Sequence, residues 1–397
     1  MRILIANEAA AGAGGVESYL AAVMPALAAR GHQLAFLHHN PRADQGPTCL
    51  LDARVPSASV ADEGLDAAIG SVRAWEPDVC FSHNMRALDV DERLAAHWPV
   101  VKMMHGYFGT CVSGQKAHTV PTVAPCCREL GPSCLALYLP RRCGQLRPLR
   151  MISQYSWAVR QRALFERYAH VVVASRHMAE EYQRHGIDRD RLSTAPLFPT
   201  ADAVTSMRPL PPTPSVLFMG RMTTIKGGAT LARAIAEAQR IHGSPIRVTF
   251  AGDGPERDRL GRLARDLGID ASFPGWLTGA ARTAAFRAAS VVAVPSLWPE
   301  PFGLVGVEAA AHGVPAIAFD SGGIREWLRD NESGRMIADR HPRALGGAIA
   351  DVCAKPGELI RLGEGAQRVA RALSCDAHIA ILERVFTGVA TSRAATA

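Results

Sequence analysis

The sequence predicts an α/β protein built from two parallel-sheet domains that face each other across a cleft. At 397 residues the chain is longer than one hydrophobic core usually supports, so two domains of similar size are expected. Short apolar runs alternate with helix-like stretches rich in Ala, Leu and Arg, which is typical of parallel sheets covered on both faces. A proline-rich segment near the midpoint interrupts this alternation.

Nine apolar runs have the length and composition of buried strands. They are residues 2–6, 32–39, 78–83, 100–105 and 170–175 in the first half, and 215–220, 246–252, 291–296 and 315–320 in the second. Ligands of open parallel sheets bind beyond the carboxyl ends of the strands. We therefore expect the functional site in the cleft between the two domains.

The proline-rich segment RPLPPTPS (208–215) cannot continue a helix or a central strand. We predict an interdomain linker over 206–214, after an N-terminal domain over 1–205. The second domain would extend over 215–375, and a C-terminal helix and tail over 376–397.

A glycine-rich turn containing Gly12, Gly14 and Gly15 follows the first predicted strand and opens a helix, as a phosphate-binding turn would. The dinucleotide fingerprint requires Gly or Ala where this chain has Glu17, and the residues LHHN at the end of the second strand include no acidic residue. The sequence contains no Walker motif either. A nicotinamide-dependent enzyme is therefore disfavoured.

The composition is that of an ordinary globular protein, with 48% apolar and 20% charged residues. The N-terminus has a run of only about five apolar residues, too short for a signal sequence, and no run elsewhere reaches the length of a membrane span. We expect a cytoplasmic protein, at most peripheral to the inner face of a membrane.

The net charge of +7 is concentrated between residues 141 and 170, where seven arginines accompany one acidic residue, Glu166. These arginines are Arg141, Arg142, Arg147, Arg150, Arg160, Arg162 and Arg167. The patch could bind an anionic membrane surface, or it could be the solvated face of a helix. Without an aromatic-interleaved basic motif or a helix-turn-helix signature, nucleic acid is not an expected partner.

Four segments of the second half each follow a predicted strand. GRMTTIKGG carries Arg221 and Lys226 ahead of a helix expected over 228–240, and AGDGPERDRL forms a glycine turn before another helix. WPEPFGLVGVEAAAHG and SGGIRE follow the last two predicted strands. Any one of these segments could occur in many α/β proteins, but the four in this order indicate one shared binding site.

Glu300 and Glu308 lie on either side of a predicted helix start. Pro299 and Pro301 hold Glu300 in extended backbone, so its carboxylate should project into the cleft. The first helical positions, whose unpaired N–H groups would face the same cleft, are predicted to be Phe302, Gly303 and Leu304.

This arrangement suits a ligand with an anionic centre and hydroxylated ends. A helix N-terminus favours a diphosphate, and Arg221 and Lys226 would add positive charge. Carboxylates accept hydrogen bonds from hydroxyl groups. We therefore predict a diphosphate between a sugar at Glu300 and a ribose at Glu308.

Taken together, these segments resemble glycosyltransferase family 4, a retaining group with the GT-B fold of two Rossmann-like domains. The resemblance rests on GRMTTIKGG, AGDGPERDRL, EPFGLVGVE (the family's E-x7-E motif) and SGGIRE, with GGVESYL near the N-terminus. It implies a hexosyltransferase that moves a sugar from a UDP-sugar or GDP-mannose type of donor to a glycan or lipid-linked acceptor. The implied setting is cell-surface polysaccharide or glycoconjugate synthesis.

The resemblance also assigns donor-site roles. Glu300 would hold the donor sugar, Glu308 the ribose, and Arg221 with Lys226 the diphosphate. Gly15 would let the first loop approach the donor, and the remaining donor-binding positions are Gly252, Asp253, Gly254, Phe302, Gly303 and Leu304. The implied reaction needs no metal or cofactor, because these cations and the helix amides stabilise the leaving diphosphate.

Candidate residues of the first half are fewer. His105 ends a predicted strand before the flexible Gly106, and the resemblance implies that it lies near the transferred sugar. His83, Asn84 and Tyr107 would line the acceptor side. The family commonly has an acidic residue where this chain has Gly106.

Five of the nine cysteines lie between residues 111 and 143, in a segment over 106–145 that we expect to be an inserted lid on the acceptor side. Their spacing matches no common zinc motif, and cytoplasmic proteins rarely contain structural disulfides. Two alternatives stay open. The thiols could simply pack the loop, or zinc could be held by Cys111, Cys126 or Cys127, Cys134 and Cys143.

Two Asp-x-Asp sequences, at 89–91 and 188–190, are expected to be solvated surface charge rather than a metal motif. Two other functions stay open as alternatives. A sugar-nucleotide epimerase of the same fold would need an acid/base set that the sequence does not display. A catalytically silent sugar-nucleotide-binding partner would not need Arg221, Lys226, Glu300 and Glu308 together.

Overall fold

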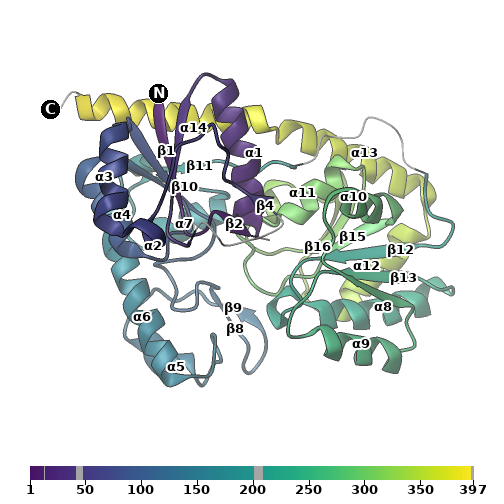
Figure 1. Cartoon of the computed structure of the whole chain (residues 1–397). Coiled ribbons are helices and arrows are strands. Elements are labelled where there is room, and N and C mark those ends of the chain that lie inside the picture. The colour runs from purple at the N-terminus through teal and green to yellow at the C-terminus, as the bar shows by residue number, and fades with distance from the viewer. Residues whose placement is uncertain (13, 42–47, 201–208, 395–397) are drawn as a thin grey trace.

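The computed structural model describes residues 1–12, 14–41, 48–200 and 209–394, which form two α/β domains side by side (Figure 1). The described part of the predicted linker, 209–214, contains no helix or strand. Its residues 206–208 lie outside the described part of the chain.

The N-terminal domain contains a seven-stranded sheet with the order β11-β10-β7-β6-β1-β3-β5, parallel throughout. Its strands are β1 (Arg2–Asn7), β3 (Gln33–His38), β5 (Ser57–Ser59), β6 (Val79–Ser82), β7 (Val100–Met104), β10 (His170–Val173) and β11 (Leu192–Thr194). The accompanying helices are α1 (Gly15–Ala29), α2 (Val60–Glu63), α3 (Leu65–Trp75), α4 (Leu88–His97), α6 (Pro148–Ala163) and α7 (Arg176–Arg184). Short 3₁₀ turns are η1 (Leu164–Glu166) and η2 (Arg189–Arg191), and β2 (Ala11–Gly12) pairs with β4 (Thr48–Cys49).

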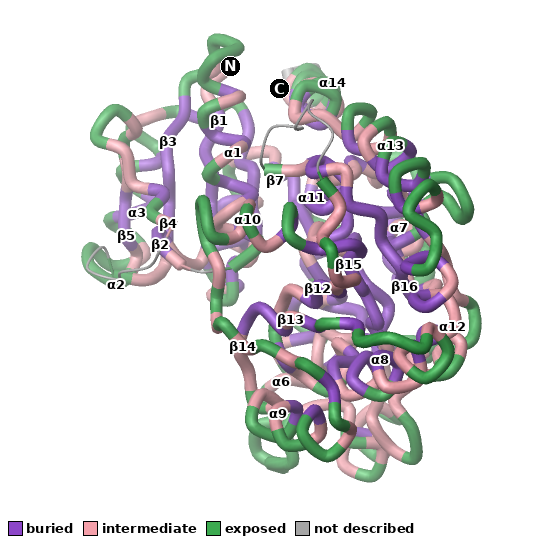
Figure 2. Tube along the Cα trace, turned by 90° about the vertical axis from the view of Figure 1, so that its right-hand side faces the viewer, coloured by how far each residue is buried: buried purple, intermediate pink, exposed green. Residues whose placement is uncertain are grey.

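The second domain contains a six-stranded parallel sheet with the order β14-β13-β12-β15-β16-β17. Its strands are β12 (Ser215–Met219), β13 (Arg247–Ala251), β14 (Ala271–Gly275), β15 (Val291–Val294), β16 (Ala316–Phe319) and β17 (Gly334–Ile337). Its helices are α8 (Gly228–His242), α9 (Arg257–Asp266), α10 (Gly279–Ala288), α11 (Leu304–Ala311), α12 (Pro342–Cys353) and α13 (Pro356–Ala372), with 3₁₀ turns η3 (Thr224–Lys226) and η4 (Gly323–Glu326). In Figure 2 the central strands are buried, whereas the outer faces of the helices are exposed.

The predicted α/β architecture is confirmed, and all nine predicted runs form strands within two residues of their expected ends. The main-sheet strands β5, β11, β14 and β17 were not predicted. β14 carries Pro274 and has no fully buried residue, and β5 and β11 are three residues long. Edge strands of this kind lack the continuous apolar run that marks a central strand.

The helix after α13, α14 (Cys375–Ala394), leaves the second domain and packs on the first. Figure 1 shows it running along the top of the N-terminal sheet. The ring of Phe386 meets that of Phe81 at 5.1 Å, and His378 Nε2 lies 2.8 Å from the hydroxyl of Tyr19 on α1. The last helix therefore completes the core of the first domain.

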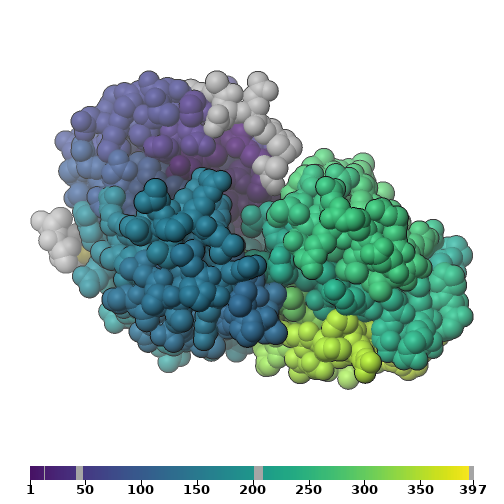
Figure 3. Space-filling view, turned by 90° about the horizontal axis from the view of Figure 1, so that it is seen from below, coloured from purple at the N-terminus to yellow at the C-terminus, as the bar shows by residue number. Residues whose placement is uncertain are grey.

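The segment 106–145 contains the short β8 (Ala117–His118) and β9 (Ala124–Pro125) pair and α5 (Ser133–Tyr138). A small core of its own joins it to α6 and includes Val112, Leu130, Tyr138 and Ala158. Seen from below, the segment covers the N-terminal domain and reaches the boundary with the second domain (Figure 3).

One acidic side chain that was expected to be solvated is buried. Asp91 is 0% exposed, and its carboxylate accepts hydrogen bonds from Lys102 Nζ (2.6 Å), Ser82 Oγ (2.6 Å) and the hydroxyl of Tyr168 (2.8 Å). The expectation was wrong because α4 turns this residue toward the sheet, where Lys102 on β7 neutralises it. The other aspartates of the two Asp-x-Asp sequences are exposed.

Within the described part of the chain, no helix has the combination of length and hydropathy that would let it span a bilayer.

Candidate active site

The carboxylate of Glu300 lies on the second-domain side of the cleft and is 4% exposed. Its Oε1 accepts hydrogen bonds from Lys226 Nζ (2.6 Å), Trp298 Nε1 (2.9 Å) and Ser296 Oγ. No donor of the described residues is bonded to Oε2. One oxygen is therefore fixed by the protein, while the other keeps its capacity to accept a hydrogen bond from a ligand.

The backbone of Glu300 is held by the glycines of the SGGIRE segment. Glu300 forms a parallel bridge with Gly322, and the N–H of Gly323 donates to the carbonyl of Glu300 at 2.7 Å. A Cβ on Gly322 would lie 2.4 Å from that carbonyl oxygen, and one on Gly323 would lie 2.3 Å from the carbonyl oxygen of Pro301. The glycines are thus required for the close approach that positions Glu300.

Helix α11 begins two residues later than predicted. Gly303 has a φ of 87° and is the N-cap, so Leu304 is the first helical residue, and the helical assignment of Phe302 and Gly303 was wrong. Such a left-handed conformation cannot be part of an α-helix. Phe302 is buried, and its carbonyl accepts a hydrogen bond from Trp327 Nε1 at 2.7 Å.

Glu308, on the first turns of α11, is 4% exposed and forms an ion pair with Arg282 of α10. Its Oε1 also accepts a hydrogen bond from the hydroxyl of Thr200 at 3.2 Å. Burial raises the pKa of Glu308, and the positive charge of Arg282 opposes that rise. Sequence reasoning missed Arg282 and Thr200, because neither belongs to a motif.

The glycine turn after β13 packs on the loop after β12. A Cβ on Gly252 would lie 2.0 Å from the carbonyl oxygen of Gly220, and one on Gly254 would lie 2.5 Å from that of Met222. The N–H of Met222 donates to the carbonyl of Asp253 at 2.7 Å. The two loops can therefore touch only because the turn carries glycines.

Arg221 and Lys226 lie at the two ends of the loop that follows β12. Arg221 is exposed and forms no ion pair or hydrogen bond through its side chain with any described residue. Lys226 Nζ lies 5.0 Å from the ring centre of Trp298, in addition to its contact with Glu300. One cation is thus unpaired and the other is fixed beside the buried carboxylate.

The first glycine-rich loop leaves open space where helix α1 begins. Gly14 is the N-cap of α1, and the carboxylate of Glu17 folds back on it so that a Cβ there would lie 2.3 Å from Oε2. Around Gly15 no atom lies within 4 Å of the position of a Cβ.

A cluster of aromatic and histidine side chains lies at the carboxyl ends of β6 and β7. His83 Nδ1 and His105 Nε2 are 3.0 Å apart, and the Tyr19 ring lies 5.4 Å from the His105 ring. His378 Nδ1 donates to the carbonyl of Pro196 at 2.9 Å, so its Nε2 accepts from the Tyr19 hydroxyl. The chain thus adds His378, from α14, to the two histidines predicted from sequence.

These histidines are held neutral. Burial, followed by the charges of Lys102 and His378, lowers the pKa of His105 to about 3. Burial lowers the pKa of His378 to about 4, and burial with the neighbouring His105 lowers that of His83 well below its usual value. Neutral imidazoles donate and accept hydrogen bonds, but they have no positive charge with which to bind a phosphate.

A cavity of about 290 Å³ opens beside these histidines in the N-terminal domain. His83 and Asn84 line it, as expected for the acceptor side, together with Glu17, Phe108 and Trp157.

Tyr107 joins the two halves of the site. It is 0% exposed, and its ring packs edge-on against Trp298 of the second domain at 6.3 Å and against His177 of α7 at 6.1 Å. Tyr107 of the first domain therefore lies against Trp298 of the second, which is itself bonded to Glu300.

The cysteines of the 106–145 segment are all free thiols. Cys127 is exposed, whereas Cys111, Cys126, Cys134 and Cys143 are partly buried. Burial raises the pKa of Cys143 to about 11, which favours the thiol over the thiolate that zinc requires. Among the described residues, no three His, Cys, Asp or Glu side chains are arranged to hold a metal ion.

Two protein-family models match the chain. Glycosyltransferase Family 4 matches residues 13–198, and Glycosyl transferases group 1 matches residues 209–369. Their boundary coincides with the segment between the two sheets.

Curated relatives match over shorter stretches. D-inositol 3-phosphate glycosyltransferase of Corynebacterium kroppenstedtii is 36% identical over 160 residues, which are 38% of this chain and 35% of that protein. Lipopolysaccharide core biosynthesis glycosyltransferase LpsE of Rhizobium meliloti is 37% identical over 144 residues, which are 35% of this chain and 40% of that protein. The matched segment thus spans less than half the length of either relative.

Solved structures match over nearly the whole chain. Sucrose-phosphate synthase from Thermosynechococcus elongatus has a TM-score of 0.69 at 21% identity and covers 98% of this chain and 99% of its own. HepE of Anabaena in complex with UDP has a TM-score of 0.70 at 18% identity, and the match covers 98% of this chain and 100% of HepE. These similarities confirm the predicted GT-B fold.

Proposed function

The chain belongs to glycosyltransferase family 4, of the group 1 type, and on this premise we propose that it moves a sugar from a nucleoside-diphosphate donor to an acceptor hydroxyl. Configuration at the anomeric carbon would be retained, as the family resemblance implies. The observation that carries the proposal is the pairing of Lys226 with the buried Glu300 at 2.6 Å, on a loop whose other cation, Arg221, is unpaired among the described residues.

The donor is of the UDP-sugar or GDP-mannose type. Glu300 accepts hydrogen bonds from sugar hydroxyls through its unoccupied oxygen, and Glu308 accepts them from the ribose. Arg221 and Lys226 bind the diphosphate through charge-assisted hydrogen bonds. HepE, which shares the fold, is in complex with UDP, and this supports a nucleoside diphosphate as ligand.

In the reaction, the bond between the anomeric carbon and the phosphate oxygen breaks as the acceptor oxygen bonds to the same face of that carbon. The acceptor proton goes to the departing phosphate oxygen. Arg221 and Lys226 stabilise the charge that develops on the diphosphate, with the amides at the start of α11. No metal ion or cofactor takes part.

The acceptor is a glycan or a lipid-linked sugar of cell-surface polysaccharide or glycoconjugate synthesis. It binds in the cavity beside His83 and Asn84, with His105 near the transferred sugar. Curated relatives include enzymes named for D-inositol 3-phosphate and for lipopolysaccharide core synthesis. Both names refer to hydroxylated molecules, which supports this choice of class.

We further propose that α6 docks on an anionic membrane surface from the cytoplasmic side. Seven large apolar side chains of the described residues are exposed, and four of these are Leu146, Leu149, Ile152 and Val159, on α6 and the turn before it. Arg147 and Arg150 are exposed beside them. An apolar stripe flanked by arginines supports binding at the headgroup boundary of an anionic bilayer.

The test is a calorimetric panel of UDP, GDP, UDP-glucose and GDP-mannose on the wild type and on Arg221→Ala. We expect one nucleotide family to bind to the wild type and to lose about tenfold or more in affinity in the variant, since a charge-assisted contact is lost. Full activity in the presence of a chelator would be expected too. Activity that disappears with chelator and returns only with magnesium or manganese would refute the metal-free account.

A further inference from the structure

The hydroxyl of Tyr107 is a buried donor without a partner. The side chain is 0% exposed, and its oxygen forms no hydrogen bond with any described residue. The other large buried tyrosines are satisfied, since the hydroxyls of Tyr138, Tyr168 and Tyr182 all form hydrogen bonds. A buried unpaired hydroxyl costs free energy that a phenylalanine would avoid.

The backbone around Tyr107 is held by hydrogen bonds on both sides of the residue. The hydroxyl of Tyr182, on α7, donates to the carbonyls on both sides of Tyr107, at 2.6 Å to Gly106 and at 3.0 Å to Phe108. The N–H of Tyr107 itself donates to the carbonyl of Gly114 at 3.4 Å. The loop that carries the Tyr107 ring is thus held in place.

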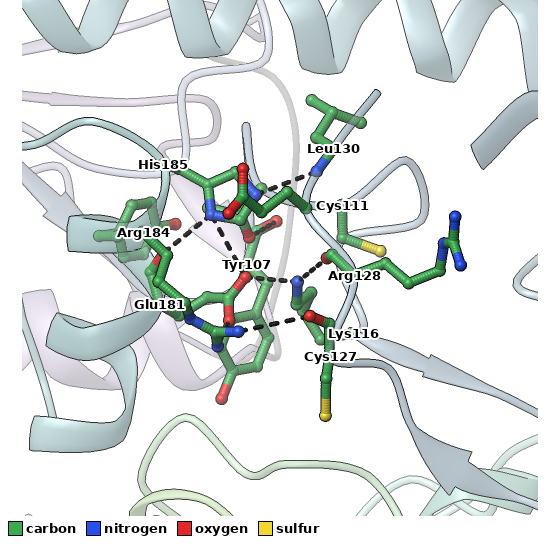
Figure 4. A network of polar contacts seen from close by, with 12 residues as sticks. Tyr107, Cys111, Lys116, Cys127, Arg128, Leu130, Glu181, Arg184 and His185 are labelled. Carbon is green, nitrogen blue, oxygen red and sulfur yellow. Dashed lines mark hydrogen bonds and ion pairs between the residues drawn. The ribbon is translucent and has the colours of Figure 1, made fainter. Parts of the chain in front are cut away.

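A buried ionic network holds the loop on α7 (Figure 4). Lys116 forms an ion pair with Glu181, with side chains 3% and 2% exposed, and Lys116 Nζ also donates to the carbonyl of Arg128. His185 Nε2 accepts a hydrogen bond from the N–H of Leu130 at 3.1 Å. Because these bonds connect α7 to several points of the 106–145 segment, they restrain the whole loop that carries Tyr107.

The Tyr107 ring lies at the contact between the domains, one side chain away from the carboxylate assigned to the donor sugar. The Tyr107 ring contacts the indole of Trp298, whose Nε1 is bonded to Glu300. Burial, followed by the nearby charges of Glu300 and Glu181, raises the pKa of Tyr107 well above its usual value. The phenol therefore stays protonated and can only donate when the partner is an acceptor oxygen.

We propose that the Tyr107 hydroxyl, which is covered in this structure, donates a hydrogen bond to an oxygen of the transferred sugar once the donor enters between Glu300 of the second domain and Tyr107 of the first. This inference rests on the proposed function. It assigns Tyr107 to the donor sugar rather than to the acceptor. A ring that only filled the domain boundary would need no hydroxyl.

The test uses Tyr107→Phe, with Tyr182→Phe as the matched control, in the full chain. The probes are UDP with UDP-glucose and GDP with GDP-mannose, and the pair that the wild type binds is used throughout. We expect Tyr107→Phe to unfold at the wild-type temperature or higher, because it removes an unsatisfied donor. Tyr182→Phe should unfold at a lower temperature, because it loses the hydrogen bond that its hydroxyl shares between the carbonyls of Gly106 and Phe108.

The binding readout separates the sugar from the nucleotide. Tyr107→Phe should bind the free nucleoside diphosphate as the wild type does, while its affinity for the nucleotide-sugar falls by about tenfold, the value of one lost hydrogen bond. Nucleotide-sugar affinity that is unchanged, or a Tyr107→Phe variant that is less stable than the wild type, would overturn the inference. A wild type that binds none of the four probes would instead overturn the proposed function, and this inference with it.

Discussion

Lys226 Nζ lies 2.6 Å from Oε1 of Glu300, so the cation assigned to the donor phosphate touches the carboxylate assigned to the donor sugar. The contact joins two segments that are 74 positions apart in the sequence. A ligand that bridges phosphate and sugar would engage both side chains without a large rearrangement of either. Under the proposed function, the pair would bind a glycosyl phosphate linkage at the point where phosphate and sugar meet.

Substitution of Glu300 should separate transfer from nucleotide binding. In Glu300→Gln we expect the transfer rate to fall by about 100-fold or more, because a charged acceptor at the reacting sugar is lost. Affinity for the free nucleoside diphosphate should change by no more than about threefold, since Glu300 contacts the sugar end. Initial rates measure the loss of transfer, and calorimetry measures the affinity for the nucleoside diphosphate. Wild-type transfer rates in Glu300→Gln would contradict the assignment of Glu300 to the donor sugar.

Arg221 and Lys226 should differ in their effect on stability. Arg221→Ala should lower nucleoside-diphosphate affinity by about tenfold or more with no change in melting temperature, because Arg221 has no ion pair among the described residues. Lys226→Ala should lower both the nucleoside-diphosphate affinity and the melting temperature, because it leaves the buried Glu300 without its cation. Arg233→Ala, at an exposed position of α8, is the control and should change neither. Equal melting losses in the first two variants would argue against this difference.

Arg282 should be needed for ribose recognition by Glu308. In Arg282→Gln the charge that opposes burial is gone and only the hydrogen bond from Thr200 still lowers the pKa of Glu308, so this pKa should rise further. Protonation then removes an acceptor as the pH falls, and affinity for UDP or GDP should become pH-dependent in the variant. The ratio of affinities for the nucleotide and its 2′,3′-dideoxy form should shrink toward one. A ratio that stays at the wild-type value in Arg282→Gln would exclude this role.

His378 should make the protein sensitive to acid. Its pKa is lowered to about 4 in the fold, so the unfolded chain binds more protons than the folded one between pH 6.5 and about 4. The stability from this neutral histidine is complete above pH 6.5 and is lost as the pH falls, by up to about 3 kcal/mol. The comparison is the free energy of unfolding at pH 7.5 and pH 4.5. His378→Gln should lose less over this interval than the wild type; equal losses would mean that His378 is not the group responsible.

The apolar stripe of α6 should control membrane binding. The double variant Leu149→Ser with Ile152→Ser should reduce co-sedimentation with vesicles of anionic phospholipid by about tenfold, because two large side chains no longer enter the bilayer. Arg147→Ala with Arg150→Ala should reduce it as well, and more strongly at low salt. Ile241→Ser, an exposed apolar position on α8, should have no effect. Vesicles of purely zwitterionic lipid should bind all these proteins weakly; strong binding there would point to an apolar interaction alone.

Prediction from sequence succeeded where the signal was local. The central strands are continuous apolar runs, so their burial on both faces could be inferred from composition alone. The segments that carry Glu300 and Arg221 are short motifs whose spacing places them at strand ends. The helix start was missed by two positions because the left-handed conformation of Gly303 depends on its packing against Trp327 and Ile324.

The remaining parts of the site depend on contacts between distant segments. Tyr19 and His378 are 359 positions apart, and their hydrogen bond forms only because α14 returns to the first domain. Arg282 and Thr200 reach Glu308 from an ordinary helix and from the end of the first domain. In the sequence, Asp91 resembles a solvated charge on a polar helix. It is buried because α4 places it against Lys102 of β7, with which it forms an ion pair.

The return of α14 also means that the chain passes between the domains twice, once near the linker and once between α13 and α14. A protease cut at the linker would therefore leave the halves associated, because the first half would still be bound to the end of the second through Phe81 and Phe386. A gene fragment that ends at residue 205 would expose that surface of Phe81 and lack the partner of Tyr19. Dissection of the two domains for separate study consequently requires a circularly permuted chain, in which α14 is fused ahead of β1.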